Sequence, residues 1–230
     1  EVRTPLTAIS GILVLIERAQ LPEKQEKLVQ AGKKASENLI KLLTDVLDSS
    51  RLEAKAVELW ERDIAIKPLV EEWQTLARGM IGKLEKDICI VAEISDDSPD
   101  KFYADDIRVS QLLNNLMDNA IRFTKQGEIS IKTYPIAATP SDPEMLVIAI
   151  ADTGIGIAQD DLGLIFERFR QVDGSITRER GGAGLGLAIS YDLAQLMGGD
   201  LKVSSELGKG TVFELYLPTH GSNAKGIDIE

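Results

Sequence analysis

The stretch Arg108–Thr124, RVSQLLNNLMDNAIRFT, constrains this chain most, because polar residues recur in it at helical spacing inside an otherwise apolar helix. Asn115 and Asn119, at i and i+4, share one helix face. Buried amides cost free energy unless they are hydrogen-bonded, so one interpretation is a pair of satisfied core asparagines. The other is that their carbonyl oxygens bind a hard cation such as Mg²⁺, which usually also holds phosphates and water. The core-facing apolar stripe beside them consists of Leu112, Leu113, Leu116 and Ala120.

Acidic residues outnumber basic ones in the chain as a whole, 37 to 26. The 230 residues carry a formal net charge of −11, which argues against nucleic acid as a partner because such a surface repels a phosphate backbone. The single cysteine, Cys89, excludes an internal disulfide, and the single histidine, His220, excludes a multi-histidine metal site within these residues. No apolar run approaches the ~20 residues that span a bilayer, so we expect no direct membrane contact in this segment.

Two helices are predicted in the first 55 residues. Apolar positions from Leu6 to Ile16 step by three and four residues, and a second such series runs from Leu28 to Val46 after Pro22. An antiparallel hairpin of this kind carries more apolar surface than two helices can cover, so a dimeric four-helix bundle is the expected solution. Docking of both helices on the following domain is the alternative.

A second domain is predicted from residue 56 to 218, because strand and helix patterns mix there. Helices are expected after Pro68, over the opening stretch and over 185–197. The loop 135–144 is expected to be exposed, and 219–230 to be a linker tail. The fold class is therefore α+β, with a hairpin at 1–55. The predicted strands are 57–66, 88–94, 128–134, 145–152, 201–206 and 212–217.

Two glycine-rich segments follow predicted strands. ADTGIGIA ends a strand with Asp152 and places Gly154 and Gly156 where the backbone must turn tightly or lie against a ligand. An aspartate there can bind an amine, although this pattern alone is more often an ordinary turn. GGAGLGLAIS leads into a helix whose N-terminus and exposed backbone N–H groups suit phosphate.

Aromatic and basic residues lie between the two glycine segments, in IFERFRQVDGSITRERG. Phe166 and Phe169 could anchor a flap there. A local positive cluster in so acidic a chain indicates that phosphates are bound beside it. The cluster comprises Arg168, Arg170, Arg178 and Arg180.

The order of these motifs resembles that of sensor histidine kinases. NNLMDNAIRFT, ADTGIGIA, IFERFRQVD and GGAGLGLAIS resemble the N, first glycine, F and second glycine boxes of that family, and EVRTPLTAISG resembles its phosphoacceptor box, H-E-x-R-T-P-L. The resemblance covers nearly the whole chain. It implies a dimerisation and histidine phosphotransfer hairpin followed by an ATP-binding α/β sandwich of the Bergerat (GHKL) type. FRQVD and GGAGLGL are most similar to hybrid kinases, which carry receiver domains after such a tail.

The resemblance also implies roles for individual residues. Asn119 would bind Mg²⁺ with Asn115 beside it. Asp152 would accept the adenine amino proton, while Arg122 and Thr124 would contact the phosphates. The other implied ATP-binding positions are Gly154, Gly156, Phe166, Phe169, Arg178, Gly182, Gly184, Leu185 and Gly186.

The phosphorylated histidine of the family would stand immediately before Glu1. Because the chain begins inside this motif, we expect it to be a segment of a longer protein. Glu1 would orient or deprotonate that imidazole, and Thr4 would position water for phosphatase activity toward a receiver. An exposed threonine without a role is the alternative for Thr4. His220, in the polar tail, is expected to be a solvated linker residue.

Two functions are compatible with these observations. Related ATPases of this fold place a water-activating glutamate where Asn115 stands, so the sequence favours a kinase that transfers the ATP γ-phosphate to histidine and then to a receiver aspartate. The alternative is a signalling scaffold or degenerate kinase that pairs its hairpin with another histidine kinase. The histidine that is missing from these residues keeps that alternative open, and Arg168, where many hybrid kinases carry proline, slightly favours it. Expected partners are a second copy and a receiver domain, and the expected location is the cytoplasmic side of an inner-membrane sensor protein.

Overall fold

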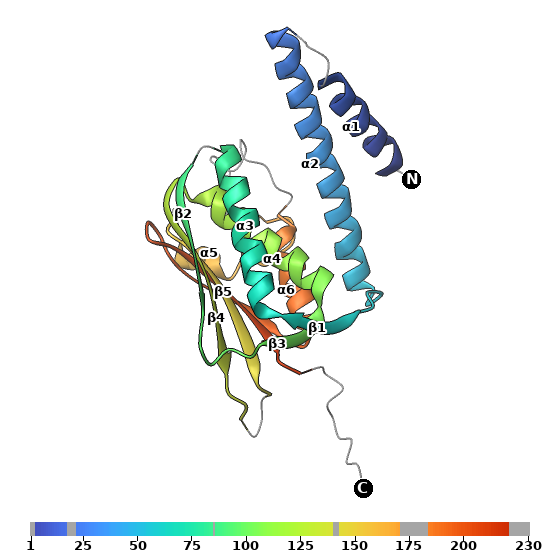
Figure 1. Ribbon diagram of the computed structural model, residues 1–230. Helices are drawn as coiled ribbons and strands as arrows, with labels where there is room; N and C mark the ends of the chain where they lie inside the picture. The colour runs from blue at the N-terminus through green and yellow to red at the C-terminus, as the bar shows by residue number, and fades with distance from the viewer. Residues whose placement is uncertain (1–2, 18–21, 85, 140–142, 171–183, 221–230) are drawn as a thin grey trace.

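Figure 1 shows the computed structural model, which describes residues 3–17, 22–84, 86–139, 143–170 and 184–220. The first helices, α1 (Arg3–Glu17) and α2 (Glu23–Glu53), lie side by side and antiparallel. Pro22 immediately precedes α2, where the fixed φ of proline suits a helix start. The Ser36 hydroxyl of α2 donates a hydrogen bond of 3.4 Å to the Leu6 carbonyl of α1. The predicted helical hairpin is therefore confirmed.

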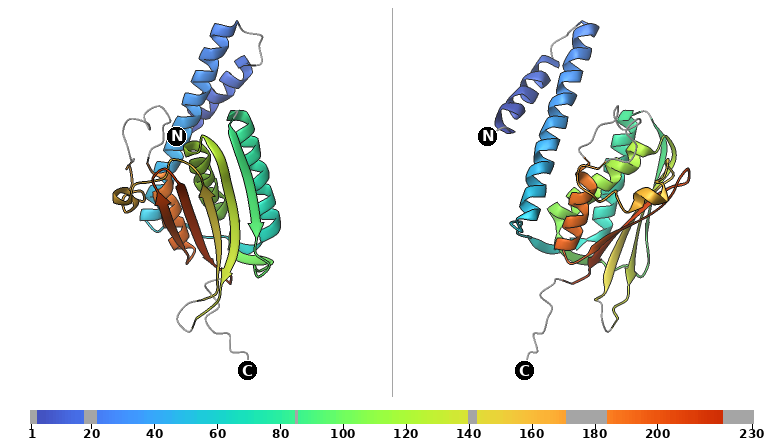
Figure 2. Two further views of the ribbon diagram at one scale, coloured as in Figure 1. Left: turned by 90° about the vertical axis from the view of Figure 1, so that its left-hand side faces the viewer. Right: turned by 180° about the vertical axis from the view of Figure 1, so that it is seen from behind.

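The second domain is a two-layer sandwich of helices on a sheet. Its main helices, α3, α4 and α6, cover one face of the sheet, as Figure 2 shows from behind. None of the helices in the described ranges is both long and apolar enough to cross a membrane. The elements of this domain are β1 (Glu61–Ala65), α3 (Ile66–Leu84), β2 (Asp87–Ile94), β3 (Lys101–Asp105), α4 (Asp106–Phe123), β4 (Gln126–Ile136), β5 (Met145–Asp152), α5 (Gln159–Leu162), α6 (Gly186–Leu196), β6 (Asp200–Glu206) and β7 (Gly210–Pro218).

The main sheet has the strand order β2-β4-β5-β7-β6. Its β2 and β4 are parallel and its other neighbours antiparallel. In this register Asp152, the last residue of β5, lies between Ile129 of β4 and Thr211 of β7. The central strand β5 therefore ends beside the C-terminal end of α4, where Phe123 lies close to Gly154.

The core lies between the helices and the sheet. Leu112 and Leu116 of α4 are completely buried, as are Leu146 and Leu215 of the central strands. Their burial follows from the helical spacing in α4 and from the alternation in the strands. A small apolar hollow remains between α3, α4 and the sheet, lined among others by Trp73. It belongs to core packing, and its lining does not include Asn115, Asn119 or Asp152.

Some details differ from the sequence-based prediction. The chain has a short extra sheet in which β1 pairs with β3, a strand that was not predicted. The strand β4 continues through Pro135 and Ile136, which were expected to lie in a loop. Thr219, expected to begin the tail, is buried and donates from its backbone N–H to the Glu144 carbonyl at 3.0 Å. The adjacent His220 is exposed, 3.9 Å from a Glu144 carboxylate oxygen.

Polar contacts join α2 to the sandwich. Lys41 Nζ lies 3.1 Å from the Asp118 carboxylate on α4. The Gln111 amide of α4 donates to Asp48 of α2 at 2.8 Å. The hairpin thus docks against the sandwich through its second helix, close to the helix that carries Asn115 and Asn119.

Candidate functional site

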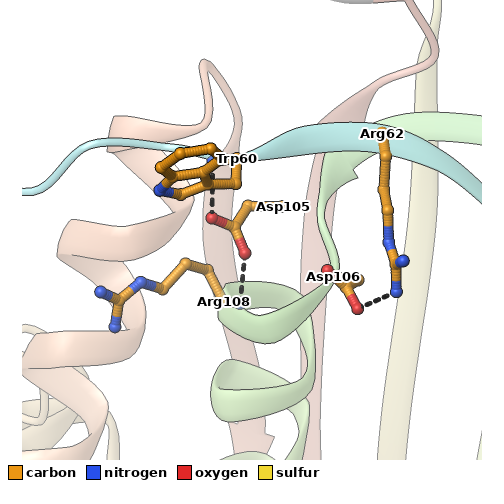
Figure 3. Close-up of polar contacts among 5 residues, drawn as sticks. All are labelled: Trp60, Arg62, Asp105, Asp106 and Arg108. Carbon is orange, nitrogen blue, oxygen red and sulfur yellow. Dashed lines mark hydrogen bonds and ion pairs between the residues drawn. The ribbon is translucent and has the colours of Figure 1, made fainter.

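The N-terminus of α4 is fixed by a buried carboxylate. Asp105 is only 3% exposed, and one of its oxygens accepts the Arg108 backbone N–H at 3.0 Å, which caps the helix. Its other oxygen accepts the backbone N–H of Trp60 at 2.9 Å. Figure 3 shows these bonds beside the ion pair of Arg62 with Asp106. One side chain therefore ties α4 to the segment that arrives from the hairpin.

Asn115 lies where α4 packs on α6. Its amide nitrogen donates to the Ser190 hydroxyl at 2.9 Å, and Ser190 is 1% exposed. Its amide oxygen lies against Gly186, the first residue of α6, so closely that a Cβ on Gly186 would collide with it. The structure thus brings two predicted site residues together. Asn119 follows one turn later on the same face and is half-buried.

The C-terminal end of α4 carries a positive side chain that the sequence analysis did not identify. The Lys86 ammonium donates to the carbonyls of Ile121 and Thr124, the latter at 2.7 Å. A cation there satisfies carbonyls that have no partner within the helix and interacts favourably with the helix dipole. Arg122, half-buried, stands in the same last turn. This end of the helix is therefore firmly held.

Asp152 ends β5 beside that turn. One of its carboxylate oxygens accepts the Gly154 backbone N–H at 2.8 Å. Burial raises the pKa of Asp152 above its ordinary value of 3.8, while hydrogen bonds from the Gly154 and Thr211 backbone oppose the shift. A Cβ at Gly154 would lie 2.6 Å from the carboxylate and 2.7 Å from the Phe123 carbonyl, so only glycine fits here.

Thr124 is placed with Asp152. Its hydroxyl is completely buried and, within the part of the chain that is described, has no hydrogen-bond partner. It lies near enough to Asp152 to lower the pKa of that carboxyl. Unpaired buried hydroxyls are rare in native proteins and indicate a missing ligand or water. Thr124 therefore lies at the carboxylate end of the site, where adenine rather than phosphate was expected.

The segment after α5 is clamped at its base. Phe166 packs on Tyr191 of α6 with ring centroids 5.3 Å apart. Phe169 has a left-handed φ of 62° and is 69% exposed, and its N–H donates to the Gly184 carbonyl at 2.9 Å. Gly184 also has φ +68°, and a Cβ there would lie 2.6 Å from the Arg170 carbonyl. The F segment and the second glycine segment therefore meet backbone to backbone.

The remaining predicted residues fall into two groups. Gly156, at φ +68°, passes directly under the Glu206 carbonyl, and Leu185 is completely buried, so both shape the backbone of the site. Glu1, Arg178 and Gly182 lie outside the described residues, as does the side chain of Thr4.

Arg168 binds two carboxylates instead of lying free for phosphate. Its guanidinium contacts Glu53, the last residue of α2, and reaches Asp192 of α6 at 2.7 Å. The sequence showed only that arginine replaces proline at this position. Its partners lie far away in the sequence and become visible only in the fold.

Comparison with protein families identifies both domains. Residues 104–221 match the family described as histidine kinase-, DNA gyrase B-, and HSP90-like ATPase. Residues 1–55 match the His Kinase A (phospho-acceptor) domain. The first match covers α4, Asp152 and α6.

Individual relatives agree with these families. The autoinducer 2 sensor kinase/phosphatase LuxQ of Vibrio cholerae is 39% identical over 218 residues, which cover 95% of this chain and 25% of that protein. Hybrid signal transduction histidine kinase A of Dictyostelium discoideum is 36% identical over 224 residues, 95% of this chain and 10% of that protein.

A solved structure gives the same answer in three dimensions. Full-length ShkA in complex with AMPPNP superimposes with a TM-score of 0.78 at 34% identity, covering 96% of this chain and 44% of that one. The matched part of this chain spans 25% of the length of LuxQ and 10% of the length of hybrid signal transduction histidine kinase A. With a phosphoacceptor hairpin joined to an ATPase domain of this type, the chain belongs to the histidine kinase family and is the catalytic core of such a kinase.

Proposed function

We propose that this core binds Mg²⁺-ATP between α4, the end of β5 and α6, and transfers the γ-phosphate to a histidine that precedes Glu1. The observation that carries the proposal is that α4 contacts both other parts of the site, through Asn115 against Gly186 of α6 and through Phe123 against Gly154, two residues after Asp152. A docked hairpin of the phosphoacceptor family lies on the same helix, α4. Receiver and dimer partners belong to this proposal too.

The end of β5 fits adenine. Asp152 is a partly buried carboxylate that can accept an exocyclic amine, and the unpaired Thr124 hydroxyl beside it offers a further hydrogen-bonding group. The absence of a side chain at Gly154 leaves the backbone close to the carboxylate. These features select a flat, polar ring at this end of the site.

The α4–α6 contact fits the phosphates and a metal ion. The Asn115 amide oxygen and the Asn119 side chain are oxygen ligands of the kind that Mg²⁺ prefers. The N-terminus of α6 offers backbone N–H groups at Gly186, and Arg122 adds charge. When bound, the ion would neutralise charge on the β- and γ-phosphates during transfer.

The chain's own residues divide the remaining work. Glu1 would hold the acceptor imidazole with its attacking nitrogen unprotonated, so that this nitrogen meets the γ-phosphorus in line with the leaving oxygen. Thr4 would position water for a separate reaction, the hydrolysis of the aspartyl phosphate on a receiver domain. In the longer protein the phosphoryl group then passes to a receiver aspartate, and the location of that protein at the inner membrane stays a prediction.

Transfer is favoured over simple hydrolysis by the nature of Asn115. A side-chain amide, unlike the carboxylate of a glutamate, is not basic enough to accept a proton from water, whatever its nitrogen binds. ATP should therefore be held until a histidine is delivered. The scaffold alternative, in which the hairpin pairs with another kinase, is favoured by Arg168, which binds carboxylates of the hairpin and of α6.

Labelling of two matched chains tests the proposal. The chain extended by one histidine before Glu1 should acquire acid-labile, base-stable phosphate from Mg²⁺-ATP, whereas the chain as given should bind ATP and stay unlabelled. Asn119→Ala in the extended chain should abolish labelling. An extended chain that binds ATP and dimerises but stays unlabelled would support the scaffold.

A further inference from the structure

The contact between Asn115 and Ser190 is not explained by core packing alone. Ser190 lies on α6, one turn after Gly186, so both residues face α4. Ser190 is 1% exposed, and its hydroxyl accepts a hydrogen bond of 2.9 Å from the Asn115 amide nitrogen. The same amide therefore presents its nitrogen to Ser190 and its oxygen to Gly186.

We infer that Ser190 is a positioning residue, which holds the Asn115 side chain with its oxygen toward the metal and phosphates. This inference rests on the proposed Mg²⁺-ATP site. A side-chain amide has two ends of similar shape, and only the oxygen can bind a cation. A hydrogen bond to the nitrogen distinguishes the two orientations, as outer contacts commonly do for metal ligands.

The local structure leaves the amide little freedom to move. Gly186 gives it space on one side, where any Cβ would collide with the oxygen. Ser190 receives its nitrogen on the other side. Without the Ser190 hydroxyl, the Asn115 amide would rotate so that its nitrogen reaches another hydrogen-bond acceptor. Its oxygen would then point away from Gly186 for part of the time.

Calorimetric ATP titrations with and without Mg²⁺ test the inference. In Ser190→Ala the gain in ATP affinity that Mg²⁺ produces should fall about 10-fold, while affinity without Mg²⁺ should change less than about 2-fold. The matched control is Ser98→Ala in the turn between β2 and β3, which removes a hydroxyl bonded at 3.2 Å to the Thr133 carbonyl of β4 in the same domain. It should change neither titration.

A double-mutant cycle separates orientation from packing. Asn115→Asp replaces the amide with a carboxylate whose two ends are both oxygen, so orientation no longer matters. In that background, Ser190→Ala should alter the Mg²⁺ gain by less than about 2-fold. An equal effect of Ser190→Ala in both backgrounds, or equal loss with and without Mg²⁺, would overturn the inference in favour of a packing role.

Nuclear magnetic resonance of the unmodified chain gives an independent result even where Ser190→Ala fails to fold. The side-chain amide signals of Asn115 can be assigned because they are absent from the spectrum of Asn115→Asp. In the unmodified chain these amide protons should exchange slowly with solvent and show a cross-relaxation peak to the Ser190 β-protons. A fast-exchanging amide without that peak overturns the inference. By contrast, ATP affinity of the unmodified chain that is indifferent to Mg²⁺ would reject the proposed metal site, whatever the amide shows.

Discussion

The helices of the hairpin and of the sandwich carry the same types of apolar residue at the same helical spacing, but they bury these side chains to very different extents. Leu112 and Leu116 of α4 are 0% exposed, whereas Leu39 and Leu42 of α2 are 43% and 38% exposed. In α1, Ile9 is 48% exposed. The sandwich therefore closes its own core, but the hairpin keeps an apolar face that its two helices and its dock on α4 do not cover.

The sandwich buries its apolar surface within one chain, whereas the hairpin needs a further surface to bury its own. In the sandwich, each helix packs on the broad apolar face of the sheet within the same chain. In the hairpin, each helix packs mainly against the other helix. The dimeric bundle that we propose for the hairpin would supply that surface from a second copy.

The largest effect is expected from charges on the hairpin face. Replacing Ile9 and Leu42 with glutamate should convert dimers to monomers, because about half of each side chain remains to be buried in both protomers. That surface is worth ~3–5 kcal/mol, or about two to four decades in the dissociation constant. Light scattering at micromolar concentration measures the change. Ile107→Glu, at a position on α4 that is 68% exposed, should leave the dimer intact. A monomeric unmodified chain would refute the interface.

Leucine truncation compares the two regions directly. Leu116→Ala, at a fully buried position of α4, should lower the free energy of unfolding of the sandwich by ~2–5 kcal/mol through lost contacts and a cavity. Leu42→Ala should lower it by less than about 1 kcal/mol and should act instead on dimerisation. Urea unfolding at several protein concentrations separates the effects. Similar, concentration-independent losses in both variants would contradict the distinction.

A partly buried carboxylate occurs in each region, Asp45 in the hairpin and Asp152 in the sandwich, but only Asp152 is expected to bind ligand. Asp152→Asn should weaken ATP binding by about 10- to 100-fold, the loss of ~1.5–3 kcal/mol for one charge-assisted hydrogen bond. Asp45→Asn in α2 should change the affinity less than about 2-fold. Calorimetry that shows equal affinities for Asp152→Asn and the unmodified chain would remove Asp152 from the adenine site.

The same pair predicts a pH dependence. Burial raises the pKa of both Asp45 and Asp152 above 3.8, so the folded state holds these protons more tightly than the unfolded state. The resulting stability is fully present below pH 3.8 and is lost as the pH rises through the folded values. Each Asn variant should flatten that part of the unfolding free energy against pH. Unchanged slopes would show that the carboxyls are better solvated than the structure indicates.

The smallest effect is expected on the sheet face away from the helices. Glu214 accepts hydrogen bonds from Tyr134 at 2.5 Å and from Tyr216 at 3.3 Å. Burial first, and then Glu214, raises the pKa of both phenols. In Glu214→Gln the phenolate absorbance should therefore appear at lower pH. Glu93→Gln, which removes the partner of Lys132 on the same sheet, should not shift it.

The sequence predicted those parts of the fold that local patterns determine. The apolar run MLVIAIAD matches β5 from end to end, because a central strand is buried on both sides and reads as a continuous apolar segment. The strand β3 was missed because its five residues form an edge strand that depends on pairing with β1. Boundaries such as the end of β4 also depend on the neighbouring strand.

The site follows the same rule. Helical spacing predicted that Asn115 and Asn119 share a face, but Ser190, which receives the Asn115 nitrogen, stands 75 positions away. The polar residue in the apolar run LAIS was the only local signal for it. Lys86 likewise reaches the end of α4 only because β2 pairs beside β4. The residues that we propose to face the ligand were therefore recognisable by motif, whereas the side chains that contact them became visible only in the fold.

The Arg168 contact makes the joint between the domains sensitive to salt. One guanidinium spans Glu53 at the end of the 31-residue α2 and Asp192 on α6, and these side chains are partly exposed to water. Counterions screen such pairs without disturbing either core. A long helix amplifies small rotations at its base into large displacements at its far end. The range of angles that the hairpin samples should therefore widen as ionic strength rises, although both domains keep their folds.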